Sequence, residues 1–503
     1  MIKFKQLLTF AAALTVSAGA LAQQTPPLEM AYRIKNEAFN NSKADSLAQF
    51  ITDYLGPRLA ASDLKVRAEQ LVVDRLKEMG YDNAHIEKAS DFEKGGWDNK
   101  RNYVAMTAPY YTAFASTPKA WSGSTDGLVT GECVVVDINN TDELKKHSGK
   151  LKGKIILLPI SGKYELSFRP QASRYTDEQL KNMEADTRPR SGGRRPATDR
   201  KAAAQRQYTT DSILRAEGAL AVIAGDGTFN IPGSRGVNYK IGNPEPLCQI
   251  TLPIEAHNRM VRLLNKGHKV EMEIDIRNQF TDRPVINNVI AEIPGTDPKL
   301  KNEVVLIGAH LDSWHGGTGG ADNGSGCITM MEAMRILKDL DVKPRRTIRL
   351  ALWGGEEQGL YGSRGYRDTK LVDPETGKEL PGFKDFALYL NMDYSAGRFR
   401  GIYNEENDMA NPFFEVWSKP VANLGFGTIA PRRVGSTDHV TFSDKGLPAF
   451  QFIQDGLDYF RTYHTLADTY ERLVTSDLQV NACIAAWLAY CAAMDDNRIP
   501  MRK

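Results

Sequence analysis

The residues of this chain best suited to chemistry are histidines and acidic residues that directly follow apolar stretches. Residues 304–309 are apolar and small and run into His310, and Thr347–Trp353 ends shortly before the adjacent Glu356 and Glu357. Imidazole nitrogens and carboxylate oxygens are ligands that Zn²⁺ accepts, and a catalytic zinc site keeps a position open for water. The spacing therefore predicts a hydrolytic metal site at the ends of buried strands.

Three further candidate ligands come later in the chain. Asp322 lies in a glycine-rich loop before an expected helix, Asp393 follows the apolar residues 388–392, and His464 lies between Tyr463 and a threonine. Helix capping is the alternative interpretation of Asp322. The loop lacks the lysine of a P-loop, so a phosphate site is a poor interpretation.

Glu356 and Glu357 are the most diagnostic pair. Two adjacent carboxylates beside a core repel each other unless a cation or a proton compensates. One explanation gives Glu357 to a metal and leaves Glu356 facing substrate as a base; two solvated loop acids are the alternative. Asp312, two residues after His310, could accept the second ring N–H of that histidine or act through its backbone neighbours. A satisfied core His–Asp pair stays open here.

The composition argues only against functions that need a strong net charge. The 503 residues carry a net charge of +2, with 41% apolar and 25% charged residues. This near-cancellation gives no case for nucleic-acid or membrane-surface binding. Residues 1–22 combine lysines, an apolar run and an Ala-Leu-Ala ending, which predicts a signal peptide cleaved near Ala22 and no membrane span in the mature protein. We therefore expect export to a periplasm or secretion.

The cysteines and the remaining histidines carry less information. The five cysteines show no CxxC spacing, and Cys483 and Cys491 would lie roughly 12 Å apart on one helix, so we expect buried, unbridged thiols. His315 could approach the cleft and His439 could line it. His257 and three other histidines lie in surface-like contexts.

The pattern of apolar residues divides the chain into segments. Residues 46–81 have helical periodicity with a turn at Gly56, and short β-branched runs follow from about residue 110. Residues 163–206 are polar and arginine-rich, which favours an exposed, partly disordered insertion. From residue 284 onward strands alternate with helices. We therefore predict an α/β fold with a mixed, largely parallel central sheet covered by helices on both faces, and a β-rich second domain.

Several motifs, in this order, resemble the M28 family of zinc peptidases. They are AHLDS at 309–313, GADNGSG at 320–326, WGGEEQGLYGS at 353–363, LNMDY at 390–394 and YHTLADT at 463–469. Within the family, the likeness is closest to dipeptidases of the plasma glutamate carboxypeptidase type. The resemblance implies a peptidase domain made of residues 23–109 and 283–503, interrupted by a protease-associated domain at 110–282 that contains the basic insertion.

The resemblance also implies a role for each motif residue. Asp322 would bridge two zinc ions, one also bound by His310 and Asp393 and the other by Glu357 and His464. Glu356 would be the general base that activates a hydroxide between the metals. Asp312 would support His310, and Tyr463 would stabilise the oxyanion. Peptides or dipeptides would be the substrates, and a homodimer is left open.

Two alternatives compete with a zinc aminopeptidase or dipeptidase. A glutaminyl cyclase-like acyl transferase would use the same fold with one zinc, and a peptide-binding or receptor-like protein would have lost the metal. The sequence also leaves Co²⁺ or Mn²⁺ open, since they accept the same ligands.

Overall fold

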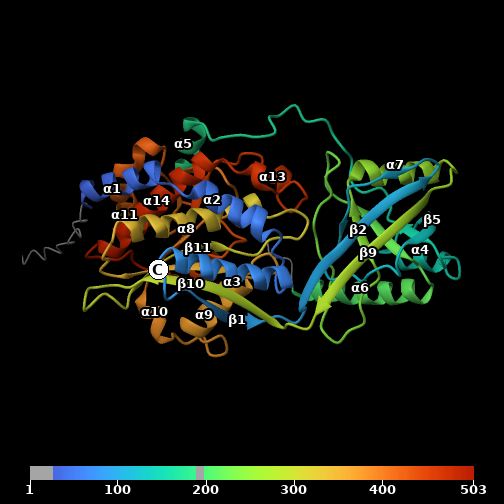
Figure 1. Ribbon diagram of the computed structural model, residues 1–503, viewed down its shortest axis with the longest axis horizontal. Helices are drawn as coiled ribbons and strands as arrows, with labels where there is room; N and C mark the ends of the chain where they lie inside the picture. The colour runs from blue at the N-terminus through green and yellow to red at the C-terminus, as the bar shows by residue number, and fades with distance from the viewer. Residues whose placement is uncertain (1–25, 188–196, 503) are drawn as a thin grey trace, which may run out of the picture.

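The computed structural model describes residues 26–187 and 197–502. The signal peptide predicted at residues 1–22 lies outside the described residues. Two eight-stranded sheets organise the described chain, one on each side in Figure 1.

The first sheet places four parallel strands at its centre. Its strand order is β1-β10-β12-β11-β13-β16-β14-β15, and β12, β11, β13 and β16 run parallel to one another. The strands are β1 (His85–Asp91), β10 (Val285–Ile293), β11 (Val304–His310), β12 (Thr347–Trp353), β13 (Phe386–Asn391), β14 (Phe399–Tyr403), β15 (Thr428–Ala430) and β16 (Ala449–Gln454). β1, β10 and β14 join by antiparallel pairing.

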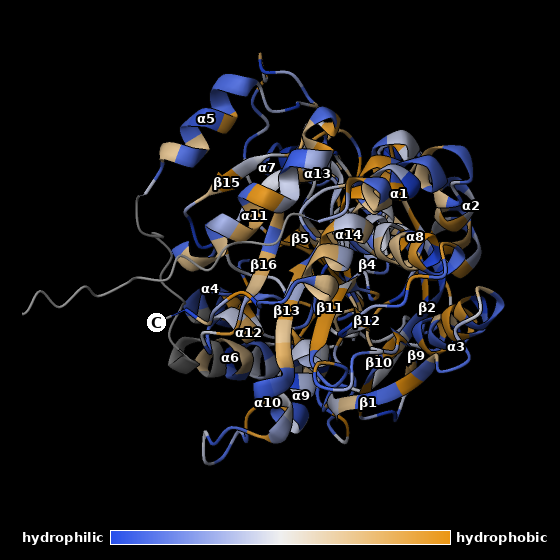
Figure 2. Ribbon diagram, turned by 90° about the vertical axis from the view of Figure 1, so that its left-hand side faces the viewer, coloured by the Kyte–Doolittle hydropathy of each residue, from blue (hydrophilic) through white to orange (hydrophobic). Residues whose placement is uncertain are grey.

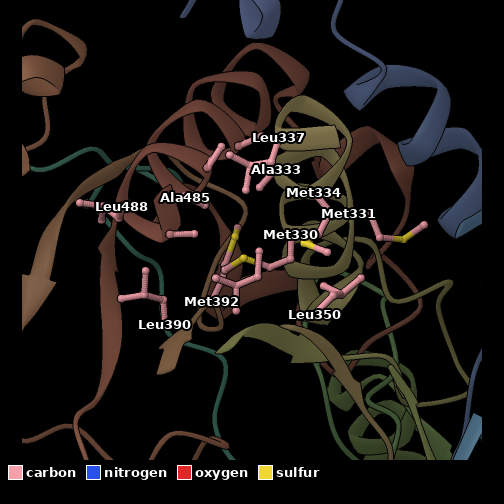
Figure 3. Close-up of a cluster of buried hydrophobic side chains, with 14 of the residues drawn as sticks. Met330, Met331, Ala333, Met334, Leu337, Leu350, Leu390, Met392, Ala485 and Leu488 are labelled. Atoms are coloured by element: carbon pink, nitrogen blue, oxygen red, sulfur yellow. The ribbon is translucent and has the colours of Figure 1, made fainter. Parts of the chain in front are cut away.

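Helices cover both faces of this sheet, because its central strands are apolar on both sides. One face packs against α1 (Leu28–Asn40), α2 (Ala44–Gln49), α3 (Asp63–Glu78), α8 (Ser325–Asp339), α11 (Asn411–Ser418) and α14 (Thr475–Met494). Figure 3 shows this core, where Met330, Met334 and Leu337 of α8 meet Leu390 of β13 and Leu488 of α14. The other face packs against α9 (Tyr361–Lys370), α10 (Pro381–Asp385) and α12 (Val440–Ser443).

The second sheet lies to the right in Figure 1 and is also mixed. Its order is β3-β2-β9-β5-β6-β7-β8-β4, and the long antiparallel pair of β2 and β9 forms the link toward the first sheet. The strands are β2 (Gly96–Ala108), β3 (Thr112–Ala113), β4 (Thr117–Pro118), β5 (Val129–Val135), β6 (Ile155–Leu157), β7 (Ala221–Gly225), β8 (Gln249–Leu252) and β9 (Glu271–Thr281). Its helices are α4 (Thr141–Lys146), α6 (Ala197–Ala216) and α7 (Ile254–Asn265).

The predicted fold class is confirmed: the fold is mixed α/β with a largely parallel centre and helices on both faces. Hydropathy follows the layers in Figure 2, where β11 and β13 are mostly apolar and α5 (Asp177–Ala185) is mostly polar. The second sheet already begins at Gly96, inside the stretch that the sequence assigned to the peptidase domain. The division into domains stays a prediction.

The described residues 163–187 of the basic segment are mostly exposed, as its composition favours, but they are anchored to the first sheet's side of the molecule. Its described part contains α5 and the start of α6. Leu180 of α5 is buried against Ala430 and Ile453 of the first sheet. Arg174 donates hydrogen bonds to Asp455 and Asp477. The arginine-rich composition of the whole segment gave no indication of these contacts.

Two smaller expectations concern membranes and thiols. None of the helices within 26–187 and 197–502 has the length and apolar character that a membrane crossing requires. The five cysteines are buried and unbridged, as expected.

Candidate metal centre

The candidate ligands meet at one edge of the first sheet. His310 ends β11, Glu357 follows β12 and Asp393 follows β13, and these three strands are parallel neighbours. Carboxyl ends of parallel strands share an edge, which is where open α/β sheets bind ligands. Asp322 comes from the loop before α8, and His464 follows α13 (Tyr459–Thr462).

The donor atoms form two groups that share Asp322. In the first, His310 Nε2 lies 3.3 Å from Asp322 Oδ1 and 3.7 Å from Asp393 Oδ2. In the second, His464 Nε2 lies 3.0 Å from Asp322 Oδ2 and 2.9 Å from Glu357 Oε2. The two oxygens of Asp322 therefore face one imidazole each.

This donor set fits a pair of zinc ions. Ligand atoms about 2.0–2.2 Å from a tetrahedral zinc ion are about 3.3–3.6 Å apart. The first group has separations of 3.3 and 3.7 Å, and the second is slightly tighter, at 3.0 and 2.9 Å. His310 Nε2 and Glu357 Oε1 are buried and make no hydrogen bond within the described structure. Buried polar atoms without partners are rare in native proteins and need an explanation. Coordination of a cation satisfies both atoms.

The electrostatics of the site also call for a cation. Burial, reinforced by repulsion from Asp322 and partly offset by His464, raises the pKa of Glu357 to about 7. Burial also raises the pKa of Glu356 well above its ordinary value, with Asp393 and Asp438 adding repulsion and His310 opposing it. Burial disfavours the imidazolium of His464, but the carboxylates of Asp322 and Glu357 outweigh it and raise its pKa to about 10. Carboxylates so placed remain ionised at neutral pH when a metal ion compensates them.

Asp312 reaches the site differently from the simplest prediction. His310 Nδ1 lies 2.9 Å from the backbone carbonyl oxygen of Asp312, and the Asp312 carboxylate is farther, at 3.8 Å. That carboxylate instead accepts the backbone N–H groups of Glu356 (3.1 Å) and Glu357 (3.2 Å). One residue thus orients the imidazole with its backbone and the glutamate pair with its side chain.

Asp468 holds the loop of the shared ligand. Its carboxylate accepts the backbone N–H groups of Ala321 (2.6 Å) and Asp322 (3.1 Å). Helix capping, the alternative role of Asp322, falls instead to Asn323, whose side chain accepts the N–H of Gly326 at 3.0 Å.

A fully buried arginine, which the sequence analysis did not single out, fixes the segment between His310 and Asp322. The Arg58 guanidinium donates only to backbone carbonyls, at distances of 2.7–3.2 Å: those of Ile51, Gly56, Leu311, Thr318 and Gly319. Ser313 Oγ also accepts the Arg58 backbone N–H at 3.1 Å. A planar group with five donors suits such an array. A lone arginine after Gly-Pro carries no sequence signal for this role.

A buried network of polar side chains supports Asp393. Gln451 of β16 donates to the carbonyl oxygen of Asp393 at 2.8 Å, and Asn391 donates to Gln451 (2.7 Å) and to Thr437 (2.9 Å). The network ties the neighbouring strands β13 and β16 together beneath the ligand. Buried amides whose hydrogen bonds are satisfied make such a network more rigid.

The loop that carries His464 rests on the second sheet. Ser234 donates its backbone N–H to the carbonyl oxygen of His464 at 2.7 Å, and Gly233 forms an isolated β-bridge with Thr465. The fit is close, since a Cβ placed on Gly316 would overlap Ser234 Oγ. The second sheet therefore helps to position a candidate ligand.

The donors open onto a cleft of about 1490 Å³. Glu356 and Tyr463 line it together with Asp322, Glu357, Asp393 and His464. The Tyr463 ring is stacked on Tyr459 at 4.9 Å and tilted beside His464 at 4.5 Å. The base and the oxyanion donor expected from the sequence thus share one cleft with four of the five candidate ligands, whereas the fifth, His310, is buried and does not line it.

The structure separates the remaining histidines from the cleft. His315 does not line it; burial lowers its pKa to about 4, and its Nε2 lies 2.7 Å from the Pro118 carbonyl. His439 is also buried and does not line the cleft, with Nε2 3.1 Å from Glu405 Oε1. His257 is fully buried in α7, so its surface-like sequence context was misleading.

Comparisons with known proteins agree with this architecture. The solved structure of a peptidase M28 precursor from Shewanella amazonensis superposes with a TM-score of 0.67 at 23% identity, over 95% of this chain and 99% of that one. BSAP, a zinc aminopeptidase from Bacillus subtilis, gives a TM-score of 0.53 at 20% identity, over 90% and 94% of the two chains. The fold is thus that of the zinc aminopeptidases.

The sequence comparisons give the family. Residues 288–489 match peptidase family M28. Carboxypeptidase Q of Mus musculus is 26% identical over 459 residues, covering 90% of this chain and 85% of the mouse protein, and the human protein is 25% identical over the same length. The match to the M28 family thus lies in residues 288–489, and both the resemblance and the predicted enzyme class, a peptidase, are confirmed.

Proposed function

We propose that this chain is an exported, zinc-dependent exopeptidase that hydrolyses the N-terminal bond of peptides or dipeptides. The observation that carries the proposal is the arrangement around Asp322, whose two oxygens face His310 and His464 separately. One zinc ion would be held by His310, Asp322 and Asp393, the other by Asp322, Glu357 and His464. Export is inferred from the signal-peptide pattern of residues 1–22.

Zinc, when bound, supplies Lewis acidity at the scissile peptide bond and acidifies water. Glu356 accepts the proton of the attacking water and then delivers it to the nitrogen of the leaving amine. The phenol of Tyr463 donates a hydrogen bond to the carbonyl oxygen as that oxygen gains charge. Asp312 keeps Glu356 in place through the backbone N–H that its carboxylate accepts.

The preference for a chain end follows from the free α-amino group of the substrate. Because the carboxylates of Asp322, Glu357 and Asp393 would be compensated by bound zinc, a free α-amine could be held by a zinc ion together with neighbouring carboxylates. An acylated nitrogen could not be held in this way, since its lone pair is delocalised into the acyl group. We also infer that residues 110–282 are a protease-associated domain, on the basis of the motif resemblance and the separate second sheet. The homodimer stays a prediction.

The test is a substrate panel. We expect the zinc-loaded protein to cleave free dipeptides and aminoacyl-anilides but not their N-acetylated forms, with activity lost to a chelator and restored by Zn²⁺. The ratio of dipeptide to anilide turnover decides between dipeptidase and aminopeptidase. Cleavage of N-acetylated substrates would contradict an exopeptidase. No cleavage by the folded, zinc-loaded protein would return attention to a cyclase or a binding protein.

A further inference from the structure

A second pocket of about 390 Å³ adjoins the candidate cleft, and Phe460 lines both. Three segments form its walls: residues 163–173 of an arm that leaves the second sheet, Thr228 and Phe229, and residues 457–461. The arm arches from the second sheet to α5, as Figure 1 shows. None of the candidate metal ligands lines this pocket.

Three exposed aromatic side chains line the second pocket among mostly polar residues. The rings of Tyr164 and Phe229 meet edge to face at 5.6 Å, and the guanidinium of Arg461 lies 5.7 Å from the Phe229 ring. Tyr164 and Phe229 are each 40% exposed and Phe460 is 77% exposed. Clustered exposed aromatic side chains that border a cleft mark a binding surface.

Backbone hydrogen bonds fix these walls in place. Phe229 donates its backbone N–H to Glu255 at 2.6 Å. At the end of the arm, Ser173 and Leu457 exchange backbone hydrogen bonds of 3.1 and 2.9 Å. Leu457 follows β16, so these bonds connect the arm to the first sheet. A pre-formed surface loses little entropy when a ligand binds.

The occupant follows from the position of the pocket. An exopeptidase holds the N-terminal residue at the metals, so the part of a peptide that leaves the cleft is its C-terminal part. Arg461 also lines the pocket; Asp458 accepts one of its N–H groups at 2.9 Å, and the guanidinium keeps further donors that suit a peptide carbonyl. We propose that the pocket is a subsite for an apolar or aromatic side chain beyond the second residue of an oligopeptide. This inference rests on the proposed function.

The experiment measures binding to the zinc-loaded Glu356→Gln protein, so that bound peptides are not cleaved. Calorimetry compares Leu-Ala-Ala-Phe with Leu-Ala-Ala-Ala, and Leu-Ala serves as a short control. We expect the phenylalanine peptide to bind about fivefold more tightly than the alanine peptide, as an aromatic contact allows. Adding Phe229→Ala should remove that preference and leave the affinity for Leu-Ala unchanged.

The matched control is Phe168→Ala, because Phe168 is a 95% exposed aromatic of the same arm that does not line the pocket. It should keep the fivefold preference. Equal affinity for the two tetrapeptides, or a preference that survives Phe229→Ala, would overturn the subsite while leaving the proposed function intact. Loss of binding of every peptide, Leu-Ala included, would contradict the proposed function and the subsite with it.

Discussion

The two halves of the candidate metal centre are built in different ways. His310, Asp322 and Asp393 are buried, and two of them end neighbouring parallel strands. In the other half, the His464 side chain is 28% exposed and its loop is held by the backbone of a segment from the second sheet. The first half is thus fixed by the core of the first sheet alone. The second half also takes Glu357 from the loop after β12, but its His464 depends on contact between the two sheets. We expect the sheet-fixed half to hold its metal more tightly.

The largest expected effect is on catalysis and should leave metal binding in both halves of the centre unchanged. Glu356 lines the cleft but belongs to neither donor group. Glu356→Gln should lower kcat about 10²–10⁴-fold, because the amide cannot accept the proton of the attacking water. Zinc content, measured on the purified variant by atomic emission, should be unchanged. Retained turnover would show that another group is the base.

A substitution at Arg58 breaks the sheet-fixed half. Arg58→Met leaves the carbonyls of Leu311, Thr318 and Gly319 without their donor. The free energy of unfolding should fall by about 3–5 kcal/mol, measured by denaturant titration with zinc present. Arg58→Lys is the matched control and should fall in between, since an ammonium group reaches fewer carbonyls. An Arg58→Met protein as stable as wild type would mean that the guanidinium does not hold this segment.

Much of the candidate site could be predicted from the sequence, since each candidate ligand lies in a local sequence pattern that can be recognised without the structure. His310, Glu357 and Asp393 lie at or shortly after the ends of apolar strands, and parallel strands bring such residues together. The supporting contacts could not be predicted. Arg58 acts on carbonyl groups some 250 residues away, and Ser234 acts on the His464 loop through its backbone. Neither partner is marked by its residue type.

In chelator-treated protein, the pH dependence of stability gives a further test of the comparison between the two halves of the centre. The folded pKa is raised to about 7 for both Glu357 and Asp468, from ordinary values of 4.5 and 3.8. A raised carboxyl pKa contributes stability that is complete below about pH 4 and is lost as the pH rises through 7. The Tm of the metal-free protein should therefore fall between pH 5 and 8, and zinc should restore more of it at pH 8. A Glu357→Gln protein should show a shallower fall; an equal slope would exclude Glu357 as a cause.

The smallest effect should come from loosening the contact between the two sheets. Gly316→Ala places a methyl group against Ser234 Oγ, which should cost about 1–3 kcal/mol and shift the loop that carries His464. We expect the weaker zinc ion to bind about tenfold less tightly, measured by competition with a chelating dye, and the tighter one to be unaffected.

Two controls isolate this contact. Adding Ser234→Gly to Gly316→Ala removes the overlap and should restore affinity. Gly427→Ala, where a Cβ would meet open space, should change neither ion. Equal weakening of both ions by Gly316→Ala would show that the second sheet does not act through the His464 half alone.

Zinc stoichiometry during stepwise chelation tests the central claim most directly. Two zinc ions per wild-type chain should leave in two phases. The His464→Ala protein should lack the early phase, and the Asp322→Ala protein should lack both phases. A single zinc ion per wild-type chain, or an Asp322→Ala protein that keeps a full complement, would contradict a two-metal centre shared through Asp322.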